Sequence, residues 1–335
     1  MLAAYHHAAV ALRRAPSVVV CGHLRPDGDA IGSVLALTLA LRSIGVPAIP
    51  TLAEKKARVP KTYDFLPGTG LYAPLGDLEV PAVFVALDTP NLGRLGEAAE
   101  LAEAAQTLVV MDHHPDAQEY GHVNVRDSKA SSTSLMVWRL ITGALEVKPS
   151  PEIAMCCYVG LITDTGRFQY DNTTSDALRE AADMIDVGVE PADVARLVYQ
   201  DRSVGSLALE ARAMERITVC NHGHTAWSWI EESDFAETGA IVEEAEYLPD
   251  AVRLLGGIDA VALLRVWGDE VRVGLRSKTG SDVGSVARHF GGGGHRAASG
   301  FTWTGTKEGL LAELLPLLPG GDRDSKCYPA GGERA

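Results

Sequence analysis

No stretch of the 335-residue sequence stays apolar for long enough to cross a membrane, and no signal-peptide pattern opens the chain. Internal repeats and low-complexity segments are also absent. With 46% apolar residues, the chain is long enough for two domains with cores of their own. We therefore expect a folded cytoplasmic protein that has no membrane partner.

An excess of positive charge is lacking as well. Lys and Arg total 30 against 44 Asp and Glu, which gives a formal net charge of −14. Proteins that follow long nucleic acids usually carry a basic surface. The acidic balance argues against long nucleic acid as a partner, so any nucleic-acid substrate should be short. Most of these carboxylates serve solubility, but some are available for divalent cations.

Cysteines are few and form no metal-binding or redox motif. There are five, an odd number, and none are arranged as Cys-x-x-Cys. Disulfides are therefore not expected in a chain of this size, and the pattern favours a reducing compartment. Cys156 and Cys157 lie in an apolar segment and are expected to be buried.

The first part of the chain alternates short apolar runs with helical patterns. This alternation predicts an α/β fold with a parallel, doubly wound sheet in a domain over 1–190. The expected strands cover 17–22, 46–50, 82–88 and 107–112, and the expected helices cover 29–45, 97–106, 131–141 and 150–165.

Beyond residue 190 the pattern changes. A helical linker is predicted over 191–214, followed by a smaller α/β domain over 215–319 with a mixed or antiparallel sheet. Apolar residues there alternate with polar ones, and a turn is expected at Gly268–Asp269. The tail, 320–335, is rich in Gly, Pro and charge and is predicted to be disordered.

Metal-type side chains follow the expected strands and one expected helix. In an open parallel sheet such positions meet at one edge. Crowded carboxylates repel one another, and two divalent cations about 3.5–4 Å apart would relieve this. A mixed set of His and Asp favours Mn²⁺ over Mg²⁺ or Ca²⁺. The residues are His23, Asp27, Asp29, Asp88, Asp112, His113, His114 and Asp164.

Each of these residues also has an ordinary structural interpretation. Asp88 alone suits a turn, His23 alone a buried structural histidine, and Asp29 alone the first turn of a helix. Their joint occurrence at element ends is what favours a two-metal site. Gly28 is expected to let the loop turn tightly, so that Asp27 and Asp29 face different metals.

A second candidate site is the run of four glycines at 291–294. Its backbone N–H groups could approach an anion, although a flexible loop without a ligand is the alternative. It is not a P-loop, because no Gly-Lys-Ser/Thr follows. Trp227, Trp229 and Trp267 lie in alternating segments, where core packing is favoured over base stacking.

These motifs resemble those of a known family. The segments "HLRPDGDAIGS", "ALDT", "DHHP" and "GLITDTGRF" resemble the four motifs of the DHH phosphoesterases. The segment "GGGGHRAASG" resembles the glycine motif of the DHH-associated domain. The resemblance covers about residues 5–318 and looks most like the NrnA type, the bifunctional nano-RNases and adenosine 3',5'-bisphosphate (pAp) phosphatases.

The resemblance implies a hydrolase that cleaves short RNA, including linear dinucleotides, to mononucleotides and removes the 3'-phosphate of pAp. The reaction would use a water activated by two metal ions, most simply Mn²⁺. His23 and Asp27 would bind one ion, and Asp29, His113 and Asp164 the other, with Asp88 bridging them. Catalytic roles would fall to His114 at the scissile phosphate, to Asp88, and to Asp112, which would orient His113.

In the second domain, the resemblance implies substrate binding by Arg276 and the glycine motif, and it suggests a homodimer. Ser277 and Lys278 are further candidates for phosphate ligands. The implied substrate-binding residues are Arg276, Ser277, Gly292, Gly293, Gly294 and His295.

Several other functions remain open on the sequence. The DHH motifs also occur in manganese pyrophosphatases, but the glycine motif argues against that type. A processive RecJ-like exonuclease fits poorly with a short, acidic chain. Cyclic-dinucleotide cleavage and a non-catalytic nucleotide-binding regulator are further alternatives, although the complete set of metal ligands argues against the regulator.

Overall fold

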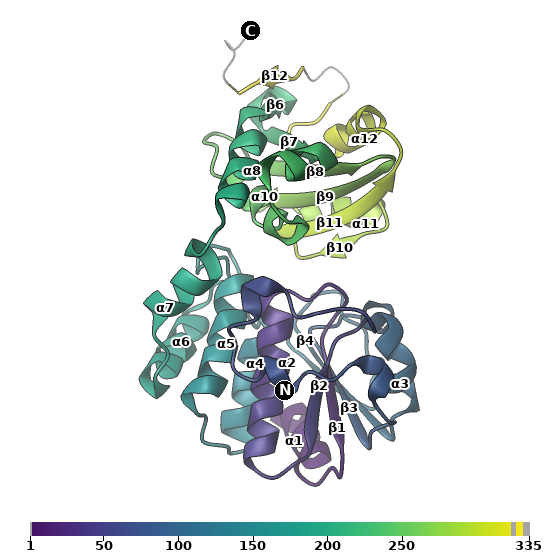
Figure 1. Ribbon diagram of the computed structural model, residues 1–335, viewed down its shortest axis with the longest axis vertical. Helices are drawn as coiled ribbons and strands as arrows, with labels where there is room; N and C mark the ends of the chain where they lie inside the picture. Colours follow the sequence, from purple (N-terminus) through teal and green to yellow (C-terminus); the bar gives the residue numbers. More distant parts are fainter. Residues whose placement is uncertain (1, 323–325, 331–335) are drawn as a thin grey trace. The chain divides into compact units, whose positions relative to one another are not determined.

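The computed structural model describes residues 2–322 and 326–330, and the chain divides into two compact units, Met1–Asp201 and Arg202–Ala335 (Figure 1). The predicted linker helix is interrupted at 201–203. Its first part belongs to the first unit and its second part to the second. The predicted domain limits stay a prediction. Within the described part of the chain, no helix is long and apolar enough to span a bilayer.

The first unit contains a five-stranded, fully parallel sheet in the order β2-β1-β3-β4-β5, which confirms the predicted fold class. The sequence pattern missed the last strand, because that short segment is only partly buried and includes Asn124 and Arg126. The strands are β1 Val18–Cys21, β2 Ala48–Thr51, β3 Val83–Leu87, β4 Thr107–Asp112 and β5 Val123–Arg126.

Helices cover both faces of this sheet, so successive strand residues enter two different cores (Figure 1). Val18 and Val20 pack beneath α2, α4 and α5, whereas Val19 packs on the side of α3. The helices of this unit are α1 Leu2–Arg13, α2 Gly28–Ser43, α3 Ala99–Ala104, α4 Thr133–Arg139, α5 Pro151–Asp164, α6 Ser175–Val187 and α7 Pro191–Ala195. Shorter helical turns include η4 Leu92–Ala98, η5 Leu140–Ala144 and η6 Arg196–Gln200.

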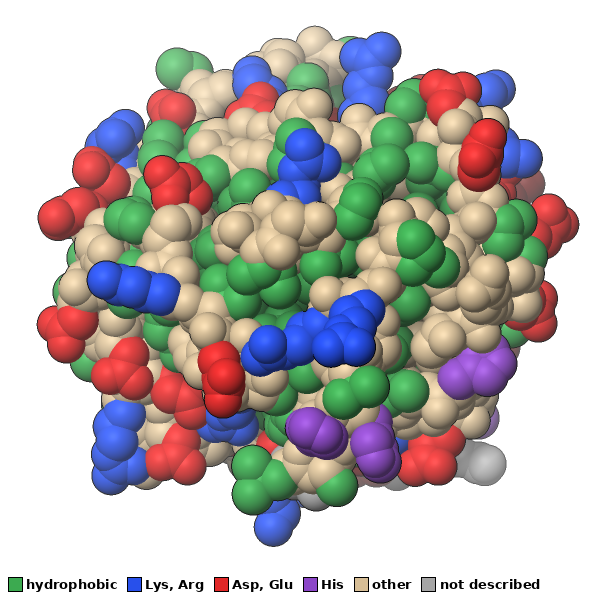
Figure 2. Space-filling model, turned by 90° about the horizontal axis from the view of Figure 1, so that it is seen from below, with side chains coloured by type: hydrophobic (Ala, Val, Ile, Leu, Met, Phe, Trp, Pro, Cys, Tyr) green, Lys and Arg blue, Asp and Glu red, His purple; other side chains and the backbone are tan. Residues whose placement is uncertain are grey.

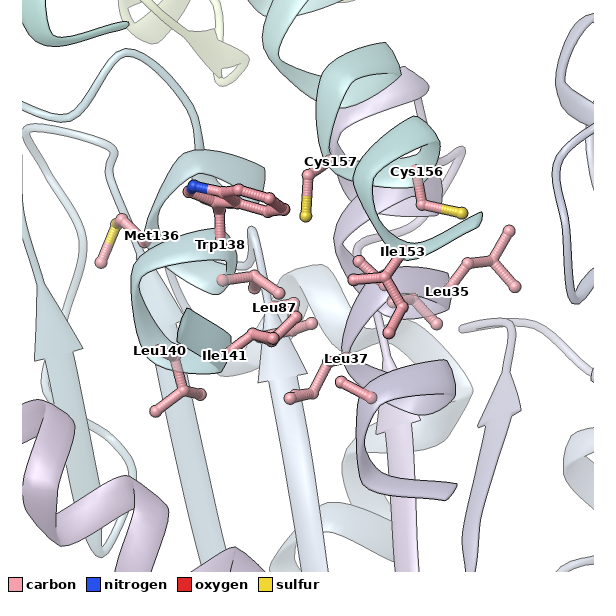
Figure 3. Packing of buried hydrophobic residues seen from close by; sticks show 14 of the residues in the cluster. Leu35, Leu37, Leu87, Met136, Trp138, Leu140, Ile141, Ile153, Cys156 and Cys157 are labelled. Carbon is pink, nitrogen blue, oxygen red and sulfur yellow. The ribbon is translucent and has the colours of Figure 1, made fainter. Parts of the chain in front are cut away.

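The larger core explains the apolar character of α2 and α5. Figure 3 shows Leu37, Leu87, Trp138, Ile141 and Ile153 gathered between these helices and the sheet. All five side chains are buried. The core holds the carboxyl ends of the strands and the first turn of α2 in one fixed arrangement, which is where the polar motifs lie.

Helices α2 and α5 touch closely through small residues. A Cβ on Gly28 would lie 2.4 Å from Thr163 Oγ1, and a Cβ on Gly32 would lie 2.3 Å from the Cys156 carbonyl oxygen. Gly28 is therefore required for this close approach and not for the tight turn that we expected. Asp27 caps α2 by accepting hydrogen bonds from the backbone N–H groups of Asp29 and Ala30.

The second unit contains a seven-stranded mixed sheet in the order β10-β11-β9-β8-β7-β6-β12. The predicted hairpin at Gly268–Asp269 joins β8 to β9, but β7 and β8 run parallel, which the alternating pattern could not show. The strands are β6 Thr218–Cys220, β7 Thr225–Glu231, β8 Ala260–Trp267, β9 Glu270–Ser277, β10 Gly293–Gly294, β11 Ala298–Thr304 and β12 Tyr328–Pro329. The α-helices are α8 Val204–Glu215, α9 Glu232–Thr238, α10 Leu248–Val252, α11 Val283–His289 and α12 Lys307–Leu314.

Trp227, Trp229 and Trp267, three of the tryptophans of this sheet, pack against its cores, as predicted. Trp227 and Trp229 lie against the core that includes Phe301, and Trp267 packs on Phe235 with ring centroids 5.1 Å apart. This packing accounts for their positions without a stacked base.

The predictions for the tail and the cysteines need correction. Tyr328–Pro329 forms the edge strand β12, paired antiparallel with β6, and Cys327 forms a disulfide with Cys220. The tail is therefore not wholly disordered, and the prediction that no disulfide forms is wrong. The cysteine pattern thus gives no support for a reducing compartment. Residues 323–325 and 331–335 of the predicted disordered tail lie outside the described residues.

The surface charge is mixed on the face seen in Figure 2, where Lys and Arg side chains are interspersed with Asp and Glu. The net charge of −14 is therefore not gathered there into one acidic field.

Candidate metal centre

The polar motifs meet at the carboxyl edge of the parallel sheet. His23 follows β1, Asp88 follows β3, and Asp112 ends β4 directly before His113 and His114. Asp88 has a left-handed backbone conformation, with φ of 56°. Because this conformation is costly for a residue with a Cβ, it marks a position whose side-chain direction is imposed by the surroundings.

One group of possible cation ligands consists of His23, Asp27 and Asp88, whose ligand atoms lie within 4.8 Å of one another. His23 Nε2 is 3.7 Å from Asp27 Oδ1 and 3.3 Å from Asp88 Oδ2. One imidazole nitrogen and two carboxylates are a suitable partial ligand set for a first-row divalent ion.

A second group consists of Asp29, Asp88 and His113. His113 Nε2 is 3.9 Å from Asp29 Oδ2, 3.7 Å from Asp88 Oδ1 and 3.5 Å from Asp164 Oδ2. Asp88 thus presents Oδ2 to the first group and Oδ1 to the second. A carboxylate arranged in this way can bridge two cations.

Burial and charge crowding disfavour the ionised form of two carboxylates of this cluster, Asp29 and Asp164. Burial is the main cause that raises the pKa of Asp29 well above its usual range, and the charges of Asp88 and Asp164 add to it. Burial also raises the pKa of Asp164 to about 7; His113 opposes this rise and Asp88 adds to it. Cations would relieve this repulsion.

The histidines and Asp88 compensate in the absence of cations. Burial would lower the pKa of His23, but the carboxylates of Asp27 and Asp88 outweigh it and raise that pKa to about 10. Burial would likewise lower the pKa of His113, but Asp164 and Asp88 raise it to about 9. Burial would raise the pKa of Asp88, yet the imidazoles around it hold that pKa well below its usual range. Without cations, the protonated imidazole rings therefore supply the positive charge that metal ions would otherwise supply.

Hydrogen bonds fix the orientation of both ligand imidazoles. His23 Nδ1 lies 2.8 Å from the Leu24 carbonyl oxygen, and His113 Nδ1 lies 3.1 Å from the Ala130 carbonyl oxygen. With Nδ1–H donated to a carbonyl, Nε2 of each ring faces the carboxylates, and once it has lost its proton it would offer its lone pair to a cation, as metal-binding histidines require. The donor set, its burial and its excess of negative charge fit two divalent cations.

The first turn of α4 supports this centre in a way that sequence analysis missed. The backbone N–H groups of Thr133 and Ser134 donate to Asp29 at 2.6 and 2.8 Å, and Thr133 Oγ1 donates to Asp88 Oδ1 at 2.9 Å. The run of capping residues at 131–134 predicted a helix start, but only the fold shows that it faces two carboxylates.

Asp112 has a different partner from the one predicted. Its Oδ1 accepts hydrogen bonds from the backbone N–H of His114 at 2.7 Å and from His114 Nδ1 at 3.1 Å. The structure therefore places Asp112 as the residue that orients His114, whereas Ala130 orients His113. Asp88, Asp112 and His114 form a third close group, and Asp88 is a member of each of these three groups.

Arg94 is a second residue that sequence analysis missed. It lies in η4, and its Nη2 is 3.2 Å from His23 Nδ1. A single arginine three residues after Asn91 matches no motif, so nothing in the sequence indicated that Arg94 would lie next to His23.

The predicted substrate-binding residues lie in the second unit. Arg276, on β9, donates from Nε to Asp250 Oδ2 at 3.2 Å. Ser277 follows it in the strand, so its side chain points to the opposite face and is buried. The structure therefore does not bring Ser277 and Arg276 to one ligand. Lys278 Nζ donates to the Leu255 carbonyl oxygen at 2.7 Å.

The glycine motif forms a narrow hairpin. Gly293 and Gly294 in β10 pair with Gly300 and Ser299 in β11. His295 follows Gly294 and lies in the turn between the two strands. A Cβ on Gly292 would lie 2.2 Å from the Gly300 carbonyl oxygen, whereas a Cβ on Gly293 would meet open space. Gly292 is thus needed for close strand approach, which the sequence alone did not distinguish from an anion-binding loop.

Comparisons with known proteins identify the class. A family model described as "DHH family, N-terminal domain" matches residues 17–161. The chain is 31% identical over 291 residues to a Thermus thermophilus protein named bifunctional oligoribonuclease and PAP phosphatase NrnA, covering 86% of this chain and 84% of the relative. A Bacillus subtilis protein of the same name is 28% identical over 310 residues, covering 90% and 94%.

Among solved structures, an exopolyphosphatase-related protein from Bacteroides fragilis matches with a TM-score of 0.85 and 25% identity, covering 93% of this chain and 94% of that one. The fold and the centre define a phosphoesterase with clusters of His and Asp side chains that could hold divalent cations. The chain belongs to the DHH family.

Proposed function

We propose that this protein hydrolyses short oligoribonucleotides to mononucleotides and removes the 3'-phosphate of pAp, with two Mn²⁺ ions in the centre. The observation that carries the proposal is Asp88, whose two carboxylate oxygens face two separate groups of ligands. The names of the Thermus thermophilus and Bacillus subtilis relatives support the substrates.

In this proposal, one cation is held by His23, Asp27 and Asp88, and the other by Asp29, Asp88, His113 and Asp164. When bound, the cations lower the pKa of a water and offset negative charge on the phosphoryl oxygens. The ring of His114 is fixed with Nδ1 toward Asp112, so Nε2, on the other side of the ring, is the atom that would meet the scissile phosphate. There it would donate a hydrogen bond to a phosphoryl oxygen, or a proton to the leaving oxygen as the P–O bond breaks, so that this oxygen departs as the nucleoside hydroxyl.

The second unit would recognise the remainder of the substrate. Arg276 already pairs with a carboxylate, so its guanidinium is oriented before any ligand arrives. We assign it to the substrate's other phosphate, and the hairpin of Gly292, Gly293, Gly294 and His295 to the nucleotide. Homodimer formation and a cytoplasmic location stay predictions.

The test compares product release with Mn²⁺ from three substrates: pAp, a 5'-phosphorylated RNA dinucleotide and pyrophosphate. Turnover of the first two with pyrophosphate intact supports the proposal. Turnover of pyrophosphate alone would refute it in favour of a pyrophosphatase, and inactivity on all three would favour a binding protein.

A further inference from the structure

The loop that carries His23 is tied to η4, the turn that carries Arg94. The Leu24 backbone N–H donates to the Arg94 carbonyl oxygen at 2.8 Å, and the Asn91 side chain caps the turn by accepting from the Arg94 backbone N–H at 3.2 Å. Arg94 is therefore held in place by its backbone, independently of its guanidinium.

The guanidinium of Arg94 lies at the edge of the carboxylate cluster without an ion pair. Burial lowers the pKa of Arg94, while the nearby charges of Asp27 and Asp88 oppose that shift. Even so, among the described residues no carboxylate oxygen lies within the 4.0 Å of its nitrogens that defines a salt bridge. The chain has a net charge of −14, yet this arginine forms no salt bridge with a described carboxylate, so its N–H groups can still donate to another anion.

Among the described residues the Arg94 guanidinium has one polar side-chain contact, and this contact cannot be a hydrogen bond in the cation-binding state. Arg94 Nη2 lies 3.2 Å from His23 Nδ1, which also lies 2.8 Å from the Leu24 carbonyl oxygen. When Nε2 of His23 serves as a ligand, Nδ1 carries the proton and donates it to Leu24. A protonated Nδ1 cannot accept from Arg94, so every N–H of that guanidinium is then available.

Arg25, two residues after His23, adds a second positive charge near this end of the centre. It is exposed, it is a like-charge neighbour of Arg94, and within the described ranges it forms no salt bridge. Its backbone is left-handed, with φ of 53°, a conformation that Arg adopts only at a cost. Two neighbouring guanidinium groups without carboxylate partners are suited to an anion with several oxygens.

We propose that Arg94, assisted by Arg25, binds the phosphoryl group on which the centre acts. Arg94 donates to a non-bridging oxygen of that phosphate, next to the His23 group of ligands, and Arg25 adds charge at the rim. This inference rests on the proposed function, because the ligand is the phosphate of the substrate. The competing role for Arg94 is purely structural, as a support for His23.

Binding measurements separate the two roles without requiring turnover. Mn²⁺ is titrated into the full-length protein by calorimetry, and inorganic phosphate is then titrated into the Mn²⁺-loaded protein. For Arg94→Gln we expect phosphate affinity to fall about 10- to 100-fold, as for loss of a charge-assisted hydrogen bond, with Mn²⁺ affinity changed by less than about twofold. Arg94→Lys, which keeps the charge but loses the planar fork, should fall between wild type and Arg94→Gln.

Two further variants complete the series. Arg25→Gly removes the guanidinium and suits the left-handed backbone, so a loss of about two- to fivefold is expected from an exposed charge. Arg179→Gln, which removes an exposed arginine on α6, is the matched control and should bind phosphate as wild type does.

Phosphate binding by Arg94→Gln equal to that of wild type would overturn the inference, as would a wild type that binds no phosphate. A parallel loss of Mn²⁺ affinity would assign Arg94 to support of His23 instead. If wild type binds phosphate through Arg94 but turns over neither pAp nor RNA, the anion site stands and the proposed substrates fail. If both are turned over, Arg94→Gln should reduce kcat about 100-fold.

Discussion

The contact between α2 and α5 makes a prediction whose size can be worked out from the structure. A Cβ added at Gly32 would lie 2.3 Å from the Cys156 carbonyl oxygen and 3.1 Å from the Gly160 backbone nitrogen. Both obstacles are backbone atoms, so α5 must move by about 1 Å to restore an ordinary contact. Overpacking of this kind costs about 1–3 kcal/mol, and the helix propensity of Ala returns up to about 1 kcal/mol.

We therefore expect Gly32→Ala to lower the free energy of unfolding by about 1–2 kcal/mol. In a unit of this length the melting temperature should fall by about 2–8 °C. The same shift moves Asp164, at the end of α5, relative to Asp29 in α2, so turnover should fall about 100-fold. Calorimetric melting measures the loss of stability, product release measures turnover, and a Mn²⁺ titration shows whether the centre still binds cations.

Gly143→Ala is the matched control, because a Cβ at Gly143 would meet no atom within 4 Å. This variant should be neutral or more stable by up to about 1 kcal/mol. If Gly32→Ala melts at the wild-type temperature and binds Mn²⁺ equally well, the close packing of α2 on α5 and its role in the centre are refuted.

Four further predictions follow from the same structure. Asp88→Asn should leave the fold intact but abolish turnover and weaken both Mn²⁺ sites, so calorimetry that still shows two unchanged sites would exclude a bridging role. Burial raises the pKa of Asp164 to about 7, and the neighbouring carboxylates keep His23 and His113 protonated below that pH, so protons compete with cations there. Mn²⁺ affinity should fall by at least about tenfold per pH unit below pH 7; a flat profile between pH 7 and 5 contradicts this. Burial would raise the pKa of Asp234, but Arg216 helps to lower that pKa to about 2. The ionised Asp234 therefore stabilises the folded state above about pH 4, and this contribution is lost as pH falls toward 2. Asp234→Asn should lower the free energy of unfolding in urea by about 1–2 kcal/mol at pH 7 and by little at pH 2. Cys327→Ser removes the disulfide, which closes a loop between cysteines 107 positions apart, and should destabilise the second unit by up to about 4–5 kcal/mol. If the protein melts at the same temperature with and without a reductant, the disulfide contributes nothing to stability.

Several features of the two units and the tail were beyond the reach of local patterns. Strand β5 is too short and too exposed to give a periodic signal, and alternation is the same in parallel and antiparallel strands, so the pairing of β7 with β8 could not be read. The disulfide joins residues 107 positions apart, and sequence spacing does not encode which cysteines meet. The sequence could have predicted that Arg276 and Ser277 point to opposite faces of the sheet, because neighbouring side chains in a strand alternate between its two faces.

The sequence by itself determined which residues make up the centre and in which elements they lie. Apolar periodicity located the parallel strands, and the carboxyl ends of such strands share one edge, so His23, Asp88 and His113 had to come together. Only the tertiary structure decided how they are used. It directed the two oxygens of Asp88 to different ligand groups, paired Asp112 with His114, and brought Arg94 to His23 from a turn about 70 residues away. These are contacts between side chains on separate elements, and their geometry follows from packing rather than from any local pattern.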